Sequence, residues 1–124
     1  MIRLDTHVIV WLYTGEEELL GDTARAAIDN EAPAISPMVQ LELNYLHEIG
    51  RLTVGGADIV NDLGRRIGLR RSDADLAAMI DAAGALTWAR DPFDRLIVAD
   101  ALVTGATLLT KDRRIQRHTS IARW

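Results

Sequence analysis

The sequence contains no cysteine. This absence excludes disulfide bonds, thiolate nucleophiles and zinc sites with thiolate ligands, and it is compatible with a reducing compartment. Lysine is almost absent too, because Lys111 is the only lysine among the 14 basic residues. The other basic residues are arginines, whose planar guanidinium suits bidentate contacts with phosphate. Charged residues are usually exposed, so solvated helix surfaces are the simpler interpretation of any single arginine.

The chain also lacks a long hydrophobic run. Its apolar stretch from Val8 to Tyr13 is far shorter than a membrane span, and Asp5 precedes it where a signal peptide would carry positive charge. We therefore expect a cytoplasmic protein with no membrane association. A length of 124 residues fits one domain, residues 1–124, and the net charge of −4 argues against a strongly basic nucleic-acid binder.

Short strands are expected to alternate with helices along the chain. The pattern predicts strands at 2–4, 34–35 and 107–110, with a further edge strand at 120–124. Helices are predicted at 6–13, from an Asp22 cap to 30, from the Ser36-Pro37 cap to 49, at 58–67, at 73–86 after a Ser72 cap, and from the Asp91-Pro92 cap to 104. A basic turn or helix follows Asp112. This alternation predicts an α/β fold with a short parallel central sheet flanked on both faces by helices.

Two aspartates follow predicted strands directly. Asp5 comes after the first strand and Asp112 after the last clear one. The carboxyl ends of parallel strands share one edge of a sheet, which is where open α/β sheets bind ligands. An aspartate at this position is also a common helix cap, so neither residue alone establishes a site.

Glu42 is expected on an apolar side of its helix, together with Met38, Leu41, Tyr45 and Ile49. A carboxylate on an apolar face is costly unless it is paired or binds a metal. The alternative is that Glu42 lies at the edge of this stripe and reaches solvent or an arginine.

Asp94 lies in the first turn of the helix that Asp91-Pro92 opens. The helix dipole favours acids there, and this effect alone would account for Asp91 and Asp94 at these positions. However, the apolar run that follows predicts a largely buried helix, with Asp94 one turn before Ile97. Asp100 is about 240° further round the helix, so we interpret it as a structural acid outside the site.

Gathered carboxylates repel one another unless a cation neutralises them. Oxygen ligands with retained waters favour Mg²⁺ or Mn²⁺. The three histidines show no metal-ligand spacing, and we expect each of them to be a surface or capping residue: His7, His47 and His118.

The stretches around the four acids resemble those of the PIN-domain nucleases, and within them the toxins of VapC-type toxin–antitoxin pairs. The resemblance extends over essentially the whole chain, and its most specific part is Asp91-Pro92-Phe93-Asp94-Arg95. The other matching stretches are Leu4-Asp5-Thr6-His7, Ser36 through Glu42, and Leu109-Thr110-Lys111-Asp112. The segment before Glu42 departs from the pattern of small and aromatic residues that is commoner in the family. This departure concerns substrate choice rather than the metal site.

The resemblance implies a PIN-like fold and metal-dependent hydrolysis of RNA phosphodiester bonds. It assigns Asp5 and Asp94 as primary Mg²⁺ or Mn²⁺ ligands, and Glu42 and Asp112 as residues that complete the site. Thr110 is expected to orient a water or a carboxylate. Arg95, Arg113 and Arg114 flank these motifs and are candidate RNA contacts.

The implied partners are an RNA substrate, a cognate antitoxin whose C-terminal segment occupies the acidic groove, and a second copy in a homodimer. The main alternative is a catalytically silent PIN-like module that binds RNA or protein; loss of an acid would mark it, and all four are present. An aspartyl-phosphate phosphatase would need a second aspartate where His7 stands, and a receiver-type phosphoacceptor would need an acidic pair at the first strand.

Overall fold

A parallel five-stranded sheet forms the centre of the computed structural model, which describes all residues from Met1 to Trp124. The strand order is β3-β2-β1-β4-β5, and every neighbouring pair is parallel. The strands are β1 (Ile2–Leu4), β2 (Pro33–Ile35), β3 (Arg70–Arg71), β4 (Thr107–Leu109) and β5 (Ala122–Arg123). The chain thus builds the sheet outward from β1 in one direction and then in the other, so that β1 and β4 flank the point where the order reverses.

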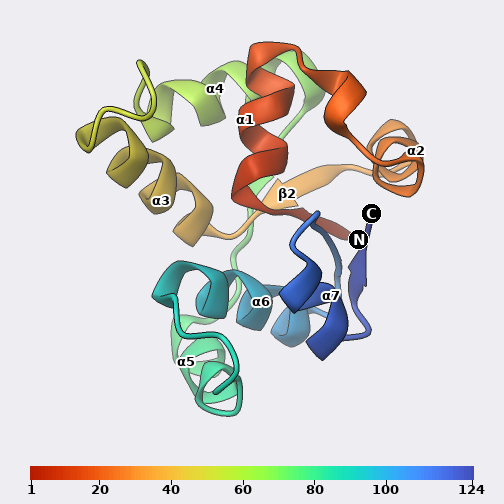
Figure 1. Cartoon of the computed structure of the whole chain (residues 1–124), viewed down its shortest axis with the longest axis vertical. Helices are drawn as coiled ribbons and strands as arrows, with labels where there is room; N and C mark the ends of the chain where they lie inside the picture. The colour runs from red at the N-terminus through yellow and green to blue at the C-terminus, as the bar shows by residue number, and fades with distance from the viewer.

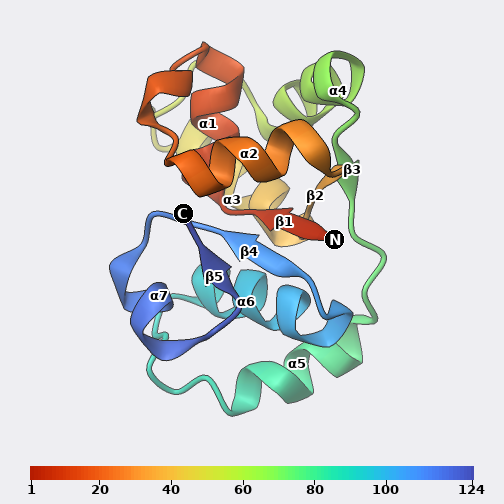
Figure 2. The same cartoon turned by 90° about the vertical axis from the view of Figure 1, so that its right-hand side faces the viewer.

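Helices cover both faces of the sheet (Figures 1 and 2). The helices that precede β3 lie on one side and those that follow it lie on the other (Figure 2). The first set is α1 (Thr6–Thr14), a 3₁₀ turn η1 (Glu17–Leu19), α2 (Asp22–Asn30), α3 (Pro37–Glu48) and α4 (Gly56–Ile67). The second set is α5 (Leu76–Gly84), α6 (Pro92–Thr104) and α7 (Arg113–His118). None of these helices has both the length and the apolar character that crossing a bilayer requires.

The core lies where the central strands meet the helices. Ile2 and Leu4 of β1 are buried, as are Leu108 and Leu109 of β4. Consecutive residues of these strands are buried because helices cover both faces, which replaces the in–out alternation of a half-exposed sheet. The predicted fold class, a parallel sheet flanked on both faces by helices, is confirmed.

Two predicted helix starts are confirmed in atomic detail. The Ser36 hydroxyl accepts the Met38 backbone N–H at 3.2 Å, with Pro37 in the first helical position. The Asp91 carboxylate accepts the backbone N–H groups of Phe93 and Asp94 at 2.8 and 3.1 Å. Each cap satisfies amides that the helix cannot pair internally, and so fixes where the helix that carries Glu42 or Asp94 begins.

Two other predicted caps are wrong. Asp22 is the first residue of α2 rather than its cap, and Gly21 takes the cap position with no side-chain bond. The helix predicted from Asp73 begins only at Leu76, where Asp75 caps it. The Ser72 hydroxyl instead accepts the Ala74 N–H in a local turn.

The residues before this turn form a strand that the sequence did not predict. Both residues of β3 are exposed arginines at a sheet edge, so they show neither the alternation nor the apolar run by which strands are recognised.

Candidate active site

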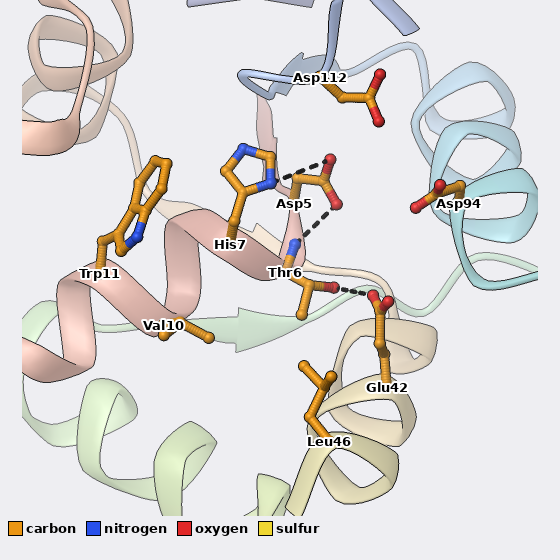
Figure 3. A pocket seen from close by; sticks show the side chains of 9 residues that line it. All are labelled: Asp5, Thr6, His7, Val10, Trp11, Glu42, Leu46, Asp94 and Asp112. Carbon is orange, nitrogen blue, oxygen red and sulfur yellow. Dashed lines mark hydrogen bonds and ion pairs between the residues drawn. The ribbon is translucent and has the colours of Figure 1, made fainter. Parts of the chain in front are cut away.

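A pocket of about 260 Å³ opens at the carboxyl ends of β1 and β4. All four predicted acids line it, and they come from four separate segments of the chain (Figure 3). Its nine lining residues are Asp5, Thr6, His7, Val10, Trp11, Glu42, Leu46, Asp94 and Asp112. The pocket therefore lies where the strand order reverses, as the ligand sites of open α/β sheets generally do.

Asp5 and Asp112 are joined through a buried threonine. The Thr110 hydroxyl donates a hydrogen bond of 2.7 Å to Oδ2 of Asp5 and accepts the Asp112 backbone N–H at 3.0 Å. Oδ1 of Asp5 accepts the Thr6 N–H at 2.8 Å, while the Asp112 carboxylate accepts two N–H groups at the start of α7. Both aspartates are thus helix caps as well as pocket residues, and capping fixes the direction of each carboxylate.

Glu42 reaches the pocket from α3. Its carboxylate accepts a hydrogen bond from the Thr6 hydroxyl, which orients it toward the end of β1 (Figure 3). Burial raises the pKa of Glu42, the Thr6 hydrogen bond opposes this rise, and the charges of Asp5 and Asp91 add to it.

The apolar stripe on which Glu42 was predicted to lie is not the buried face of α3. Leu41, Tyr45 and Ile49 are exposed by 52%, 48% and 50%, so their side of the helix does not face the core. The buried residues of α3 are Val39 and Leu43. Glu42 lies between the two faces and reaches the pocket because Thr6 holds it there.

Asp94 carries the strongest electrostatic signal in the pocket. Burial, together with the charges of Asp5, Asp91, Glu42 and Asp112, raises its pKa to about 7. Its position in the first turn of α6 would by itself favour the ionised form. The effect of burial and like charge therefore outweighs the helix dipole at this residue.

The residues of the pocket fit a hard divalent cation. Their side-chain donors are carboxylate and hydroxyl oxygens apart from the His7 imidazole, and no lysine or arginine side chain lines the pocket to neutralise them. No three acidic or histidine side chains are close enough to one another to ligate one ion directly. Mg²⁺ commonly binds through one or two carboxylates and keeps several waters, which this open arrangement allows.

His7 lies within the pocket, so the expectation that it is a surface or capping residue is wrong. Its Nε2 accepts the Lys111 backbone N–H at 2.9 Å, which places the proton of the neutral ring on Nδ1. That nitrogen is 3.8 Å from Oδ2 of Asp5. Burial lowers the pKa of His7, although the charges of Asp5 and Asp112 oppose this effect. His47 and His118 are exposed, as predicted.

The predicted RNA-contacting arginines divide into two groups. Arg113 and Arg114 are exposed at the start of α7, directly after Asp112, and so lie beside the pocket. Arg95 does not line the pocket, because its Nε donates to the Ala83 carbonyl at 2.7 Å and its side chain lines a separate apolar groove between α5 and α6.

Asp100 also lies away from the pocket, as predicted. It is fully buried and accepts a 2.9 Å hydrogen bond from Nε of Arg3, which is itself only 5% exposed.

Two features of the pocket were not predicted from the sequence. Thr6 orients Glu42, and an apolar wall formed by Val10, Trp11 and Leu46 faces the acids. Thr6 adjoins Asp5 in a stretch already singled out, so its position was a usable signal. The wall has no such signal, because an apolar residue of an amphipathic helix is normally interpreted as part of the core.

Comparisons with known proteins agree with this architecture. Residues 2–120 match the model of the PIN domain. Ribonuclease VapC22 of Mycobacterium tuberculosis is 32% identical over 123 residues, which cover 94% of this chain and 91% of that protein. VapBC2 from Rickettsia felis, solved bound to a promoter DNA fragment, matches with a TM-score of 0.70 at 22% identity, over 94% of this chain and 92% of that one. A toxin–antitoxin complex from Klebsiella pneumoniae matches with a TM-score of 0.69 at 15% identity, over 100% and 97% of the two chains. This chain belongs to the PIN domain family.

Proposed function

We propose that this protein is a divalent-metal-dependent endoribonuclease and the toxin of a toxin–antitoxin pair. The observation that carries the proposal is the gathering of Asp5, Glu42, Asp94 and Asp112 around one pocket, with the pKa of Asp94 raised to about 7 by its burial and acidic neighbours. The similarity to a ribonuclease over nearly the whole chain supports RNA as the substrate. All four acids are present, which favours catalysis over a silent binding module.

The cation, Mg²⁺ or Mn²⁺, would be held primarily by Asp5 and Asp94, with Glu42 and Asp112 completing the site. When bound, such an ion activates water and neutralises charge on phosphoryl oxygens. The protein's own contribution is orientation: Thr110 fixes Asp5, and Thr6 fixes Glu42. Hydrolysis by water needs no nucleophilic side chain, and no serine, cysteine or lysine side chain lines the pocket.

Arg113 and Arg114 are the favoured RNA contacts outside the pocket, because both are exposed beside Asp112 and neither forms an ion pair. Arg95 is less suitable, since its guanidinium donates a hydrogen bond to the backbone carbonyl of Ala83 in α5. Phosphate contacts of this kind position RNA without reading its sequence.

A homodimer and a cognate antitoxin complete the proposal for this cytoplasmic protein. The large apolar side chains exposed on α3 and α5 support the homodimer; they are Leu41, Tyr45, Ile49, Leu76 and Ile80. Exposed apolar patches of this kind commonly mark protein interfaces. The sequence resemblance to VapC-type toxins supports the existence of a cognate antitoxin. Its C-terminal segment is expected to occupy the pocket that the four acids line.

The direct test is cleavage of single-stranded RNA by the purified protein. We expect cleavage with Mg²⁺ or Mn²⁺, none in excess chelator, and none by Asp5→Asn with either ion. Full activity in chelator would contradict metal dependence. A folded wild-type protein that binds RNA but cleaves none of a diverse RNA pool in Mn²⁺ would instead identify the silent binding module.

A further inference from the structure

The pocket has a second wall that carboxylate chemistry does not use. Val10 and Trp11 of α1 and Leu46 of α3 form this wall, and His7 lies between Trp11 and Asp5 (Figure 3). Hydrated divalent ions and phosphate oxygens gain little from an aromatic surface. The part of a nucleic acid that does gain from such a surface is the nucleobase.

Two aromatic neighbours hold Trp11 in a fixed orientation. Its ring centroid lies 5.1 Å from that of His7 and 5.9 Å from that of Trp124, both in tilted arrangements. Trp124 in turn packs against Gly21, where an added Cβ would come within 2.8 Å of it. The indole is therefore supported by its neighbours, yet it is only half-buried and remains accessible from the pocket.

Lys111, the only lysine of the chain, lies at the edge of this wall. Its Nζ is 5.6 Å from the centroid of the Trp11 ring, and its side chain is exposed. The hydrogen bond from its backbone N–H to Nε2 of His7 fixes its main chain there. The structure thus combines an aromatic surface and an exposed positive charge at the rim of an acidic pocket.

We propose that Trp11 and Lys111 form a nucleotide-positioning site for single-stranded RNA, a proposal that rests on the proposed ribonuclease function. The indole stacks on the base of a nucleotide beside the cleaved bond, and the Lys111 ammonium binds a phosphate of the same strand. An exposed cation–π contact is weaker than base stacking, so an incoming base displaces the ammonium from the ring. Bases paired in a duplex are not available for stacking, which makes the substrate single-stranded.

The test compares two ten-nucleotide probes, oligoadenylate and a ribose-phosphate oligomer without bases. Binding is measured from the fluorescence anisotropy of end-labelled probes in excess chelator at low salt, so that nothing is cleaved and the signal does not depend on the tryptophans that the variants replace. Both probes carry the same phosphates, and repulsion by the acids therefore cancels in the ratio of their affinities. We expect wild-type protein to bind oligoadenylate roughly tenfold more tightly. Equal affinity for the two probes would overturn the proposal.

Variants then assign the preference to individual side chains. Trp11→Leu should abolish the preference and Trp11→Phe should keep most of it. Trp88→Phe is the matched control, because Trp88 stacks on His118 outside the pocket and its replacement should leave the preference unchanged. Lys111→Met should weaken binding of both probes alike and reduce the salt dependence by about one phosphate contact.

The outcomes separate this proposal from its alternatives. If Trp11→Leu fails to fold, Trp11→Phe decides the result, because the smaller ring should lower the base preference measurably, and a preference equal to that of the wild type would overturn the proposal. A folded Trp11→Leu that keeps the preference for bases but binds a protein partner less well would assign the wall to that partner and overturn the RNA proposal. Because cleavage is not measured, a base preference abolished by Trp11→Leu would stand even if the protein failed to hydrolyse RNA.

Discussion

The Thr110 hydroxyl donates a 2.7 Å hydrogen bond to Oδ2 of Asp5, across 105 residues of sequence and between the ends of two adjacent strands. The Thr110 hydroxyl oxygen also accepts the backbone N–H of Asp112. One buried side chain therefore sets the positions of two acids, and the geometry of the pocket depends on the register of β1 against β4.

Thr110→Val removes this link while keeping the shape of the side chain. Because the Asp112 N–H loses its acceptor and Asp5 loses a donor, we expect a loss of about 1–3 kcal/mol in the free energy of unfolding. Mn²⁺ affinity should fall about 10–100-fold, as for other groups that orient ligands. Thr104→Val is the control, since Thr104 bonds only carbonyls of its own helix. Calorimetric Mn²⁺ titration checks both variants, and equal affinities in the two would show that Thr110 does not orient Asp5.

Asp94→Asn keeps the size of the side chain and removes its charge. We expect RNA cleavage to fall by at least about 100-fold while the fold stays intact. This is a larger loss than is usual for residues that only orient metal ligands. Asp91→Asn is the matched control from the same turn, because asparagine caps a helix as well as aspartate does. Single-turnover rates in Mn²⁺ decide the assignment. Near-normal cleavage by Asp94→Asn, with loss in Asp91→Asn, would move the site to Asp91.

Metal binding should depend on pH through Asp94. Its pKa of about 7 means that a proton competes with the cation below neutrality, since a protonated carboxyl is a poor ligand. Apparent Mn²⁺ affinity should therefore fall up to about tenfold per pH unit below 7 and level off above it. Titrations between pH 5.5 and 8.5 measure this trend. The slope should diminish in Asp94→Asn, and an unchanged slope there would assign the pH dependence to another group.

Asp100, on the same helix as Asp94, should contribute to stability rather than to metal binding. It pairs with Arg3 in the core, and its second oxygen has no partner. Asp100→Ala leaves Arg3 buried without its counter-charge, so we expect a loss of about 3–5 kcal/mol in stability. The double variant Arg3→Met/Asp100→Leu should recover most of that loss. Chemical denaturation provides the measurement, and a double variant less stable than Asp100→Ala would contradict this account.

Sequence reasoning predicted the features that depend on local chemistry. Ser36 and Asp91 signal helix starts by hydrogen bonds to nearby amides, and Asp5 and Asp112 follow strands whose ends meet by topology. It failed where tertiary contacts decide. The orientation of α3 depends on its packing against other helices, so its exposed stripe was mistaken for a buried one.

Trp11 and β3 were missed for related reasons. No periodic pattern separates an aromatic residue that lines a pocket from one in the core. A two-residue edge strand of arginines has no local signature and exists only because β2 pairs with it.

The central claim is that the four carboxylates form one cation site, and it has a consequence for stability. The raised pKa of Asp94 means that the folded state binds more protons than the unfolded state between pH 3.8 and about 7. Stability of the metal-free protein therefore falls as pH rises through this window. After solvent screening, roughly 1–2 kcal/mol of destabilisation remains at pH 7. This exceeds or matches the helix-dipole contribution of about 0.3–1 kcal/mol that Asp94→Asn gives up.

Thermal melts of wild type and Asp94→Asn at pH 7, each in chelator and in excess Mn²⁺, test this claim most directly. In chelator, Asp94→Asn should melt higher than wild type. Mn²⁺ at 100 times its Kd should stabilise the wild type by about 2.7 kcal/mol and the variant by less. If Asp94→Asn melts lower in chelator and gains as much from Mn²⁺ as the wild type does, the carboxylates do not form one cation site.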